Sequence, residues 1–178
     1  MIQPPSPRGG EARPPSPSAP DPATGTPGGS EDPEPAPLLV GWREWVAFPE
    51  LDIPRIKAKV DTGARSSALH AHEIRYVRKG GRRYVRFKVY PRQKDDRSFV
   101  EARGEWLEER TVRSSFGRVE VRPVIRTLVE LGGEQWPIEV TLTRRDSMGF
   151  RLLLGRQALK GRCRVDPGAS FLTRRTHR

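Results

Sequence analysis

The sequence predicts an all-β domain, a small closed β-barrel with one short helix near its C-terminal end. Stretches in which apolar and charged residues alternate recur along the chain, and a period of two is the pattern of half-buried strands. Glycine pairs at residues 80–81 and 132–133 separate such stretches, as hairpin turns do. Many short strands joined by glycine turns, with little helix between them, favour a closed barrel.

Residues 1–37 are predicted to form a disordered tail with polyproline character. Twelve of the eighteen prolines lie in this segment, which has no aromatic residue. It cannot bury enough apolar surface to offset the entropy lost on ordering. We therefore expect one folded domain at residues 38–173, followed by a basic end at residues 174–178.

The folded part is strongly basic. The chain carries a net charge of +11, and the first 37 residues hold two arginines against five acids, so the remainder carries +14. Such a domain favours anionic partners, namely nucleic acid, anionic lipid or an acidic peptide, although a basic surface also serves solubility. No stretch is long and apolar enough to cross a membrane and no secretory signal is visible, so we expect a cytoplasmic protein.

The first expected element is an outer strand with a bend at residues 38–48. We expect its Trp42 and Trp45 in the core or an interface rather than in a nucleic-acid stacking platform. A loop at residues 52–54 then leads into a strand at residues 56–61, where apolar residues alternate with lysine.

A basic hairpin is predicted around Gly80 and Gly81. Its returning strand, residues 84–90, alternates apolar residues with arginine and lysine. Between Arg75 and Arg97 there are ten lysines or arginines, so one face is strongly positive. A basic β-ribbon with aromatic residues can also bind RNA.

A second hairpin is predicted from residues 124–131 and 136–143. Pro123 marks an edge or a bulge after a strand at residues 119–121, and residues 99–112 show no clear pattern. The last strand is expected to place apolar residues on one face and polar residues on the other: Ile138, Val140 and Leu142 against Glu139, Thr141 and Thr143.

The remaining elements are short. We expect a buried strand at residues 150–154, one helical turn at residues 157–160, and a last short strand at Phe171 and Leu172. The single cysteine, Cys163, cannot form an intrachain disulfide, and we interpret it as a packing residue.

The strand that ends at Asp61 runs directly into Thr62 and Gly63. Glycine tolerates the backbone angles of a sharp turn, and free N–H groups in such a turn can hydrogen-bond a carboxylate. The sequence therefore predicts an acid held rigidly where a strand ends. On its own, the tripeptide also fits a structural aspartate that caps a turn.

The order hydrophobic–Asp–Thr–Gly–Ala at residues 60–64, followed by Ser67 and Leu69, resembles the active-site loop of retropepsin-like aspartic peptidases. Those proteins carry a second signature, two hydrophobic residues and a glycine, often with arginine, before a short helix. Here the second signature is Leu153, Leu154, Gly155 and Arg156. The resemblance implies a barrel of the retropepsin (acid protease) type.

Other segments are similar to one branch of that group, small bacterial proteins labelled ATP-dependent zinc proteases. Its members are associated with an ATP-grasp ligase that adds glutamates to ribosomal protein tails. The similarity covers residues 39–172 and rests on four further segments: residues 41–46, 121–125, 136–139 and 142–143.

The resemblance implies an aspartic endopeptidase, which needs two adjacent carboxylates that share one proton. One Asp-Thr-Gly supplies one carboxylate, so two chains must meet as a homodimer across Asp61, Thr62 and Gly63. The Thr62 hydroxyl would fix the two loops, and Gly63 would let the backbone approach the substrate. Gly80 and Gly81 would form a flap that contacts substrate.

One departure concerns Arg65, which stands after Ala64 where retropepsins usually have an acid that pairs with the second-signature arginine. Either Arg156 finds another carboxylate, or Arg65 points into the cleft, where it would favour acidic substrate side chains. We therefore expect Ala64 and Arg65 to contact substrate, and acidic, glutamate-rich segments to be cleaved or trimmed. The resemblance also implies an ATP-grasp glutamate ligase as a partner.

The sequence gives little support to a zinc or ATP mechanism. His-Glu-x-x-His and the phosphate-binding Gly-rich motif are both missing, and His70 with His72 makes a weak metal site. We expect no cofactor. Two alternatives stay open: a non-catalytic basic module that regulates a glutamate ligase, with Asp61 only structural, and an RNA or ribosome binder that uses the basic hairpin.

Overall fold

The computed structural model describes residues 36–93, 95, 97–113, 117, 119–144 and 149–173. Within these residues the regular secondary structure is almost entirely β, with one single-turn α-helix and one 3-10 turn. The elements are β1 (Leu38–Gly41), β2 (Arg43–Phe48), η1 (Pro49–Leu51), β3 (Ile53–Asp61), β4 (Ser67–His70), β5 (His72–Lys79), β6 (Arg82–Val89), β7 (Val100–Arg113), β8 (Val119–Leu131), β9 (Glu134–Thr143), β10 (Leu152–Gly155), α1 (Arg156–Leu159) and β11 (Cys163–Asp166).

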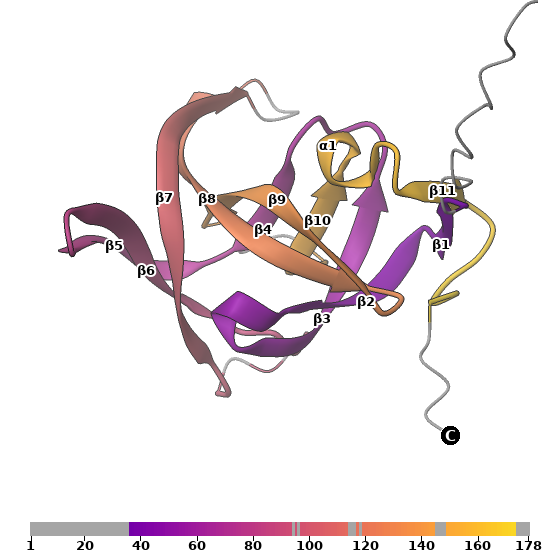
Figure 1. Cartoon of the computed structure of the whole chain (residues 1–178), viewed down its shortest axis with the longest axis horizontal. Coiled ribbons are helices and arrows are strands. Elements are labelled where there is room, and N and C mark those ends of the chain that lie inside the picture. The colour runs from indigo at the N-terminus through magenta and orange to yellow at the C-terminus, as the bar shows by residue number, and fades with distance from the viewer. Residues whose placement is uncertain are drawn as a thin grey trace, which may run out of the picture. The chain divides into compact units, whose positions relative to one another are not determined.

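Six strands close into a ring in the order β2-β3-β10-β4-β9-β8. The ring closes because β8 also pairs with β2, at Ala47 and Glu130. Strands β7, β6 and β5 continue outward from β8 as an antiparallel extension, while β1 and β11 form a separate parallel pair (Figure 1). The expected all-β class, with a closed arrangement of strands and one short helix near the C-terminus, is confirmed.

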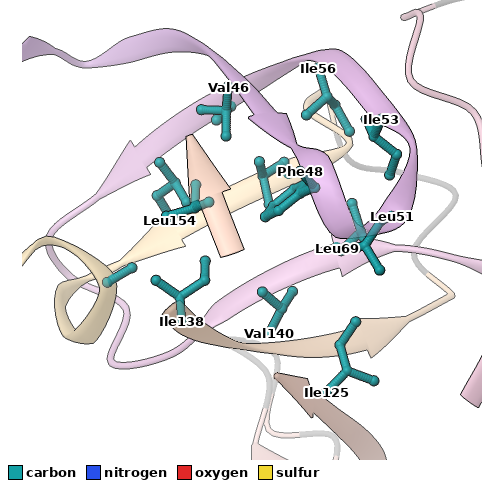
Figure 2. Packing of buried hydrophobic residues seen from close by; sticks show 14 of the residues in the cluster. Val46, Phe48, Leu51, Ile53, Ile56, Leu69, Ile125, Ile138, Val140 and Leu154 are labelled. Carbon is teal, nitrogen blue, oxygen red and sulfur yellow. The ribbon is translucent and has the colours of Figure 1, made fainter. Parts of the chain in front are cut away.

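The core is built from the inward faces of these strands. In β2, and in β3 from Ile56 onward, every second residue is buried, as the alternating sequence predicts. Figure 2 shows side chains from β2, β4, β9 and β10 pointing toward one another: Val46, Phe48, Leu69, Val140 and Leu154. Each such side chain contributes about 1.5–3 kcal/mol when fully buried, so the packed interior holds the ring closed.

Both predicted hairpins are present, with turns at residues 80–81 and 132–133. The expected loop at residues 52–54 is wrong, because η1 and a left-handed Asp52 make the turn and β3 already starts at Ile53. Pro54 is tolerated there because no ladder pairing with β2 falls on it.

One further expectation is corrected: the segment at Phe171 and Leu172 is not a strand, and Phe171 has a φ of 56°. Trp42 and Trp45 are half-buried and do not belong to the core; Trp45 faces outward because Glu44, Val46 and Phe48 take the inward positions of β2. Thr141 and Thr143, on the polar face of β9, are buried as well, and the Thr141 hydroxyl donates to the Ser67 carbonyl.

Glu44 is a fully buried carboxyl group that ties both ends of the domain together. Its oxygens accept hydrogen bonds from the N–H groups of Gly41, Leu172 and Thr173 and from the Thr173 hydroxyl. Four donors satisfy a group that would otherwise be costly to bury. The carboxyl group therefore fixes the C-terminal segment against β1 and β2.

The disordered tail predicted at residues 1–37 lies outside the described residues as far as residue 35, and the basic end predicted at residues 174–178 lies wholly outside them. No helix among the described residues has the length and apolar character needed to cross a membrane.

Candidate active site

The Asp61 carboxylate is held by its own loop. Asp61 is the last residue of β3, and its Oδ1 accepts hydrogen bonds from the N–H groups of Gly63 and Ala64, each at 3.1 Å. The side chain keeps 28% of its surface exposed, while Thr62 and Gly63 lie at the surface. A partly exposed acid is thus fixed at a strand end, as the sequence predicts.

The loop rests on the second sequence signature. Strand β10 runs parallel to β3, and Gly155 lies beside Asp61 in the register. A Cβ atom at Gly155 would come within 2.5 Å of the Ser66 carbonyl, so only glycine fits between the two segments. The Gly155 N–H donates to the Ser67 hydroxyl at 3.2 Å. The fold therefore brings the two signatures into direct contact.

Arg156 fastens the loop from its other side. Its main-chain N–H donates to the Ala64 carbonyl at 2.9 Å, and its Nη1 donates to the carbonyls of Thr62 and Gly63, each at 3.0 Å. The Arg156 guanidinium thus bonds to main-chain carbonyls of the loop. One of the two expectations for Arg156 was that it would pair with another carboxylate. The guanidinium fixes the loop backbone without an acid at position 65.

A cavity of about 450 Å³ opens beside the loop. Thr62, Arg65, Arg156 and Lys160 line it together with apolar residues that include Leu159. Three cations around an apolar floor make a site suited to a carboxylate side chain.

Two cations near the site escaped the sequence analysis. Lys59 Nζ lies 4.0 Å from Asp61 Oδ2, and Lys160 lines the cavity. In both cases the distance along the sequence to a predicted site residue could have indicated that the cation lies near the site. Lys59 is two residues before Asp61 on a strand and shares its face, and Lys160 follows Arg156 by one helical turn.

Cys163 also lines this cavity, but its chemistry is passive. Burial raises the pKa of the thiol from 9.0 to about 11, with a smaller contribution from Glu134. The thiol therefore stays protonated near neutral pH and is a poor nucleophile.

The structure does not bring the predicted flap to this site. Gly80 and Gly81 form the turn between β5 and β6, which extend in Figure 1 away from α1 and the neighbouring end of β3. A Cβ at either glycine would meet no atom within 4 Å in the part of the chain that the structure describes.

The two histidines lie together away from the loop. The rings of His70 and His72 meet edge to face at 4.5 Å between centroids. Across the described residues, no group of three or more His, Cys, Asp or Glu is placed to hold a metal ion.

The closed ring, the Asp-Thr-Gly loop after β3 and the parallel β10 strand that leads into a helical turn define a retropepsin-like protein. A family model described as "RimB-like: Retropepsin-like aspartic endopeptidase RimB" matches residues 39–176. The chain belongs to this RimB-like family.

Relatives and a solved structure agree with this assignment. A Shewanella halifaxensis protein named probable alpha-L-glutamate ligase is 44% identical over 134 residues, 75% of this chain and 29% of that protein. A Parasynechococcus marenigrum protein of the same name is 47% identical over 133 residues, 75% of this chain and 28% of that protein. The chain thus spans less than a third of these curated relatives. The crystal structure of a Legionella pneumophila protein of unknown function is 30% identical with a TM-score of 0.66, and the match covers 78% of this chain and all of that one.

Proposed function

We propose that the chain is an aspartic endopeptidase that acts as a homodimer on acidic, glutamate-rich protein segments. In this proposal Asp61 meets its counterpart across a two-fold axis, and Thr62 and Gly63 shape the shared loop. Ala64 and Arg65 contact the substrate, and Gly155 with Arg156 holds the loop in place.

The reaction follows from two carboxyl groups that share a proton. The ionised group takes a proton from a bound water, and the water oxygen attacks the peptide carbonyl carbon. The other group protonates the carbonyl oxygen. The resulting diol collapses as the C–N bond breaks. The leaving amine takes the proton that the first carboxyl group received from water, and a diol hydroxyl returns a proton to the second carboxyl group. No covalent bond to the enzyme forms.

The observation that carries the proposal is the fixed, partly exposed position of the Asp61 carboxylate. Two N–H groups orient its carboxylate, and the β10–α1 corner fixes the loop through Gly155 and Arg156. Geometry held in advance lowers the barrier of the chemical step, because little reorganisation is needed during reaction. Thr62 and Gly63 are exposed and thus open to a second chain.

Charge supports the choice of substrate. Arg65, Arg156 and Lys160 surround the cavity beside the loop, and the domain as a whole is strongly basic. Charge-assisted hydrogen bonds from guanidinium groups to carboxylates are stronger than neutral ones, so acidic side chains are preferred there.

A second candidate function is a non-catalytic module that works with a glutamate ligase. The relatives named probable alpha-L-glutamate ligase are much longer than the region that matches this chain, so a domain of this type occurs within proteins of that name. In this case Asp61 is a turn residue, and the basic surface binds the ligase or its acidic product.

The two candidates separate in one experiment on the parent chain and its Asp61→Asn variant. Each is incubated with a polyglutamate-tailed protein and with a neutral control, and the products are read by mass. Cleavage of the acidic substrate by the parent alone supports the peptidase. If neither chain cleaves while both bind the acidic tail, the module is the better description.

A further inference from the structure

The outward face of β3 carries a row of cations that the proposed chemistry does not use. Arg55, Lys57 and Lys59 alternate with buried apolar residues, so these three side chains, here called the cation row, share a face with Asp61 at the strand end. Residues on one face of a strand repeat every ~6.6 Å, so the row extends about 20 Å from Asp61 to Arg55.

Aromatic rings hold part of the row in place. The Arg55 Cζ lies 3.9 Å from the centroid of the Trp45 ring, and Lys57 Nζ lies 5.4 Å from it. Phe171 stacks on Trp45 at 5.7 Å, with Arg43 Cζ 5.0 Å from the Phe171 centroid. Contacts of this kind order long side chains while leaving their charge unneutralised.

The charges of Arg55 and Lys57 have no partner acid in the part of the chain that the structure describes, where no carboxylate lies within 4.0 Å of either one. Only Lys59 has one, at 4.0 Å in Asp61. A cavity of about 610 Å³ adjoins Arg55 and Lys57; its lining adds Arg92 and the apolar Pro54 and Phe99. The surface thus combines two unpaired cations, Arg55 and Lys57, with an apolar recess, whereas Arg92 lies 4.0 Å from an Asp95 carboxylate oxygen.

We infer that the cation row and this cavity bind an extended acidic peptide, whose carboxylates at alternate positions pair with the row while an apolar side chain enters the cavity. Single-stranded RNA fits less well, because base stacking needs open ring faces and Trp45 already contacts Arg55 and Phe171. The inference deepens the proposed function, on which it rests for the view that acidic segments are the substrate. It adds a binding surface about 20 Å long beyond the scissile bond.

Binding can be tested without cleavage in full-length chains that also carry Asp61→Asn. The probe is a fluorescein-labelled oligoglutamate long enough to span the row, followed by anisotropy. Arg55→Gln with Lys57→Gln should weaken binding about tenfold, as expected for two exposed charge pairs. Arg78→Gln with Lys79→Gln is the matched control, because it removes the same two residue types from an exposed strand and should change affinity less than about twofold.

Equal losses in the two double variants, or no loss in either, would overturn the inference, since binding would then depend on net charge or lie elsewhere. Binding of a labelled oligouridylate is measured in the same way. If the Arg55 and Lys57 double variant loses oligouridylate binding but keeps oligoglutamate binding, the inference is also overturned and the face is assigned to RNA. Circular dichroism and thermal unfolding confirm that each variant is folded.

Cleavage by the chain with Asp61 intact is measured separately. If the chain does not cleave but the cation row is needed for binding, the proposed function fails and the inference stands. If the chain with Asp61 intact cleaves, but the Arg55 and Lys57 double variant binds oligoglutamate as well as its parent, the inference fails and the proposed function stands.

Discussion

At the scale of single residues, Glu44 shows how one buried acid can organise two chain segments. Its carboxyl group accepts every hydrogen bond it makes with Gly41, Leu172 and Thr173. Such an acceptor can be replaced by no other side chain of similar size, because an amide turns one acceptor into a donor.

Glu44→Gln is therefore expected to lower the free energy of unfolding by about 2–4 kcal/mol, because the amide NH₂ faces donors it cannot bond. Urea unfolding followed by circular dichroism measures the change. Glu50→Gln is the matched control, since the Glu50 carboxylate accepts one N–H, from Leu128, at an exposed site. We expect a loss below about 1 kcal/mol there. Equal losses would contradict the role assigned to Glu44.

Cys163 gives a prediction on pH. Burial raises the pKa of its thiol to about 11 in the folded chain against 9.0 ordinarily, so the folded state holds the proton more tightly. The unfolding free energy should consequently fall as pH rises from about 9 to about 11. Alkylation by iodoacetamide should keep accelerating through pH 10 in the folded protein and level off above about 9 in urea. Identical pH profiles in the two states would refute the shift.

At the scale of elements, the contact between the Asp61 loop and β10 depends on the absence of a side chain at Gly155. Gly155→Ala should push the loop away, lower the unfolding free energy by about 1–3 kcal/mol and reduce cleavage about a hundredfold. Thermal unfolding and the polyglutamate assay measure the two effects. Gly149→Ala is the control, because a Cβ there meets no atom of the described residues within 4 Å. A Gly155 variant with full activity would show that the contact does not position the acid.

Elements with strong local patterns could be predicted from the sequence, and β7 could not. Its inward positions include Ala102 and Gly104, which carry too little apolar surface to show a strand pattern. Gly104 has no room for a side chain, because the Ile125 side chain of β8 occupies the space next to it. A register shift between Trp106 and Glu108 in β7 then changes the alternation. Both features depend on how β7 packs against and pairs with β8, so the local sequence does not reveal them.

The candidate site was predictable only in part, for a similar reason. Local pattern gives the strand and turn around Asp61, but its contact with Gly155 joins residues far apart in sequence through a parallel pairing. Periodicity carries no information on which strands pair, and the link came from the resemblance of the two signatures. The position of Gly80 and Gly81 depends equally on the outward course of β5 and β6.

At the scale of the whole molecule, the proposed active site requires two chains. If each dimer needs both copies of Asp61, mixing parent and Asp61→Asn chains at equal amounts under exchange conditions should reduce activity per parent chain to about half, because half of the parent chains then sit in mixed dimers. Sedimentation of the mixture confirms the dimer. Unchanged activity per parent chain would mean that one carboxylate from one chain is enough.

The parallel pairing of β1 with β11 also has a consequence for how this domain can be connected. The N–H of Leu38 donates to the Arg162 carbonyl, and a Cβ on Gly132 would touch both Leu38 and Thr173. The first and last described segments thus leave the domain at one place. Such a domain can be spliced into a surface loop of a larger protein with short linkers, or circularly permuted, without opening the ring. The architecture therefore allows the domain to be moved from one protein to another as a unit.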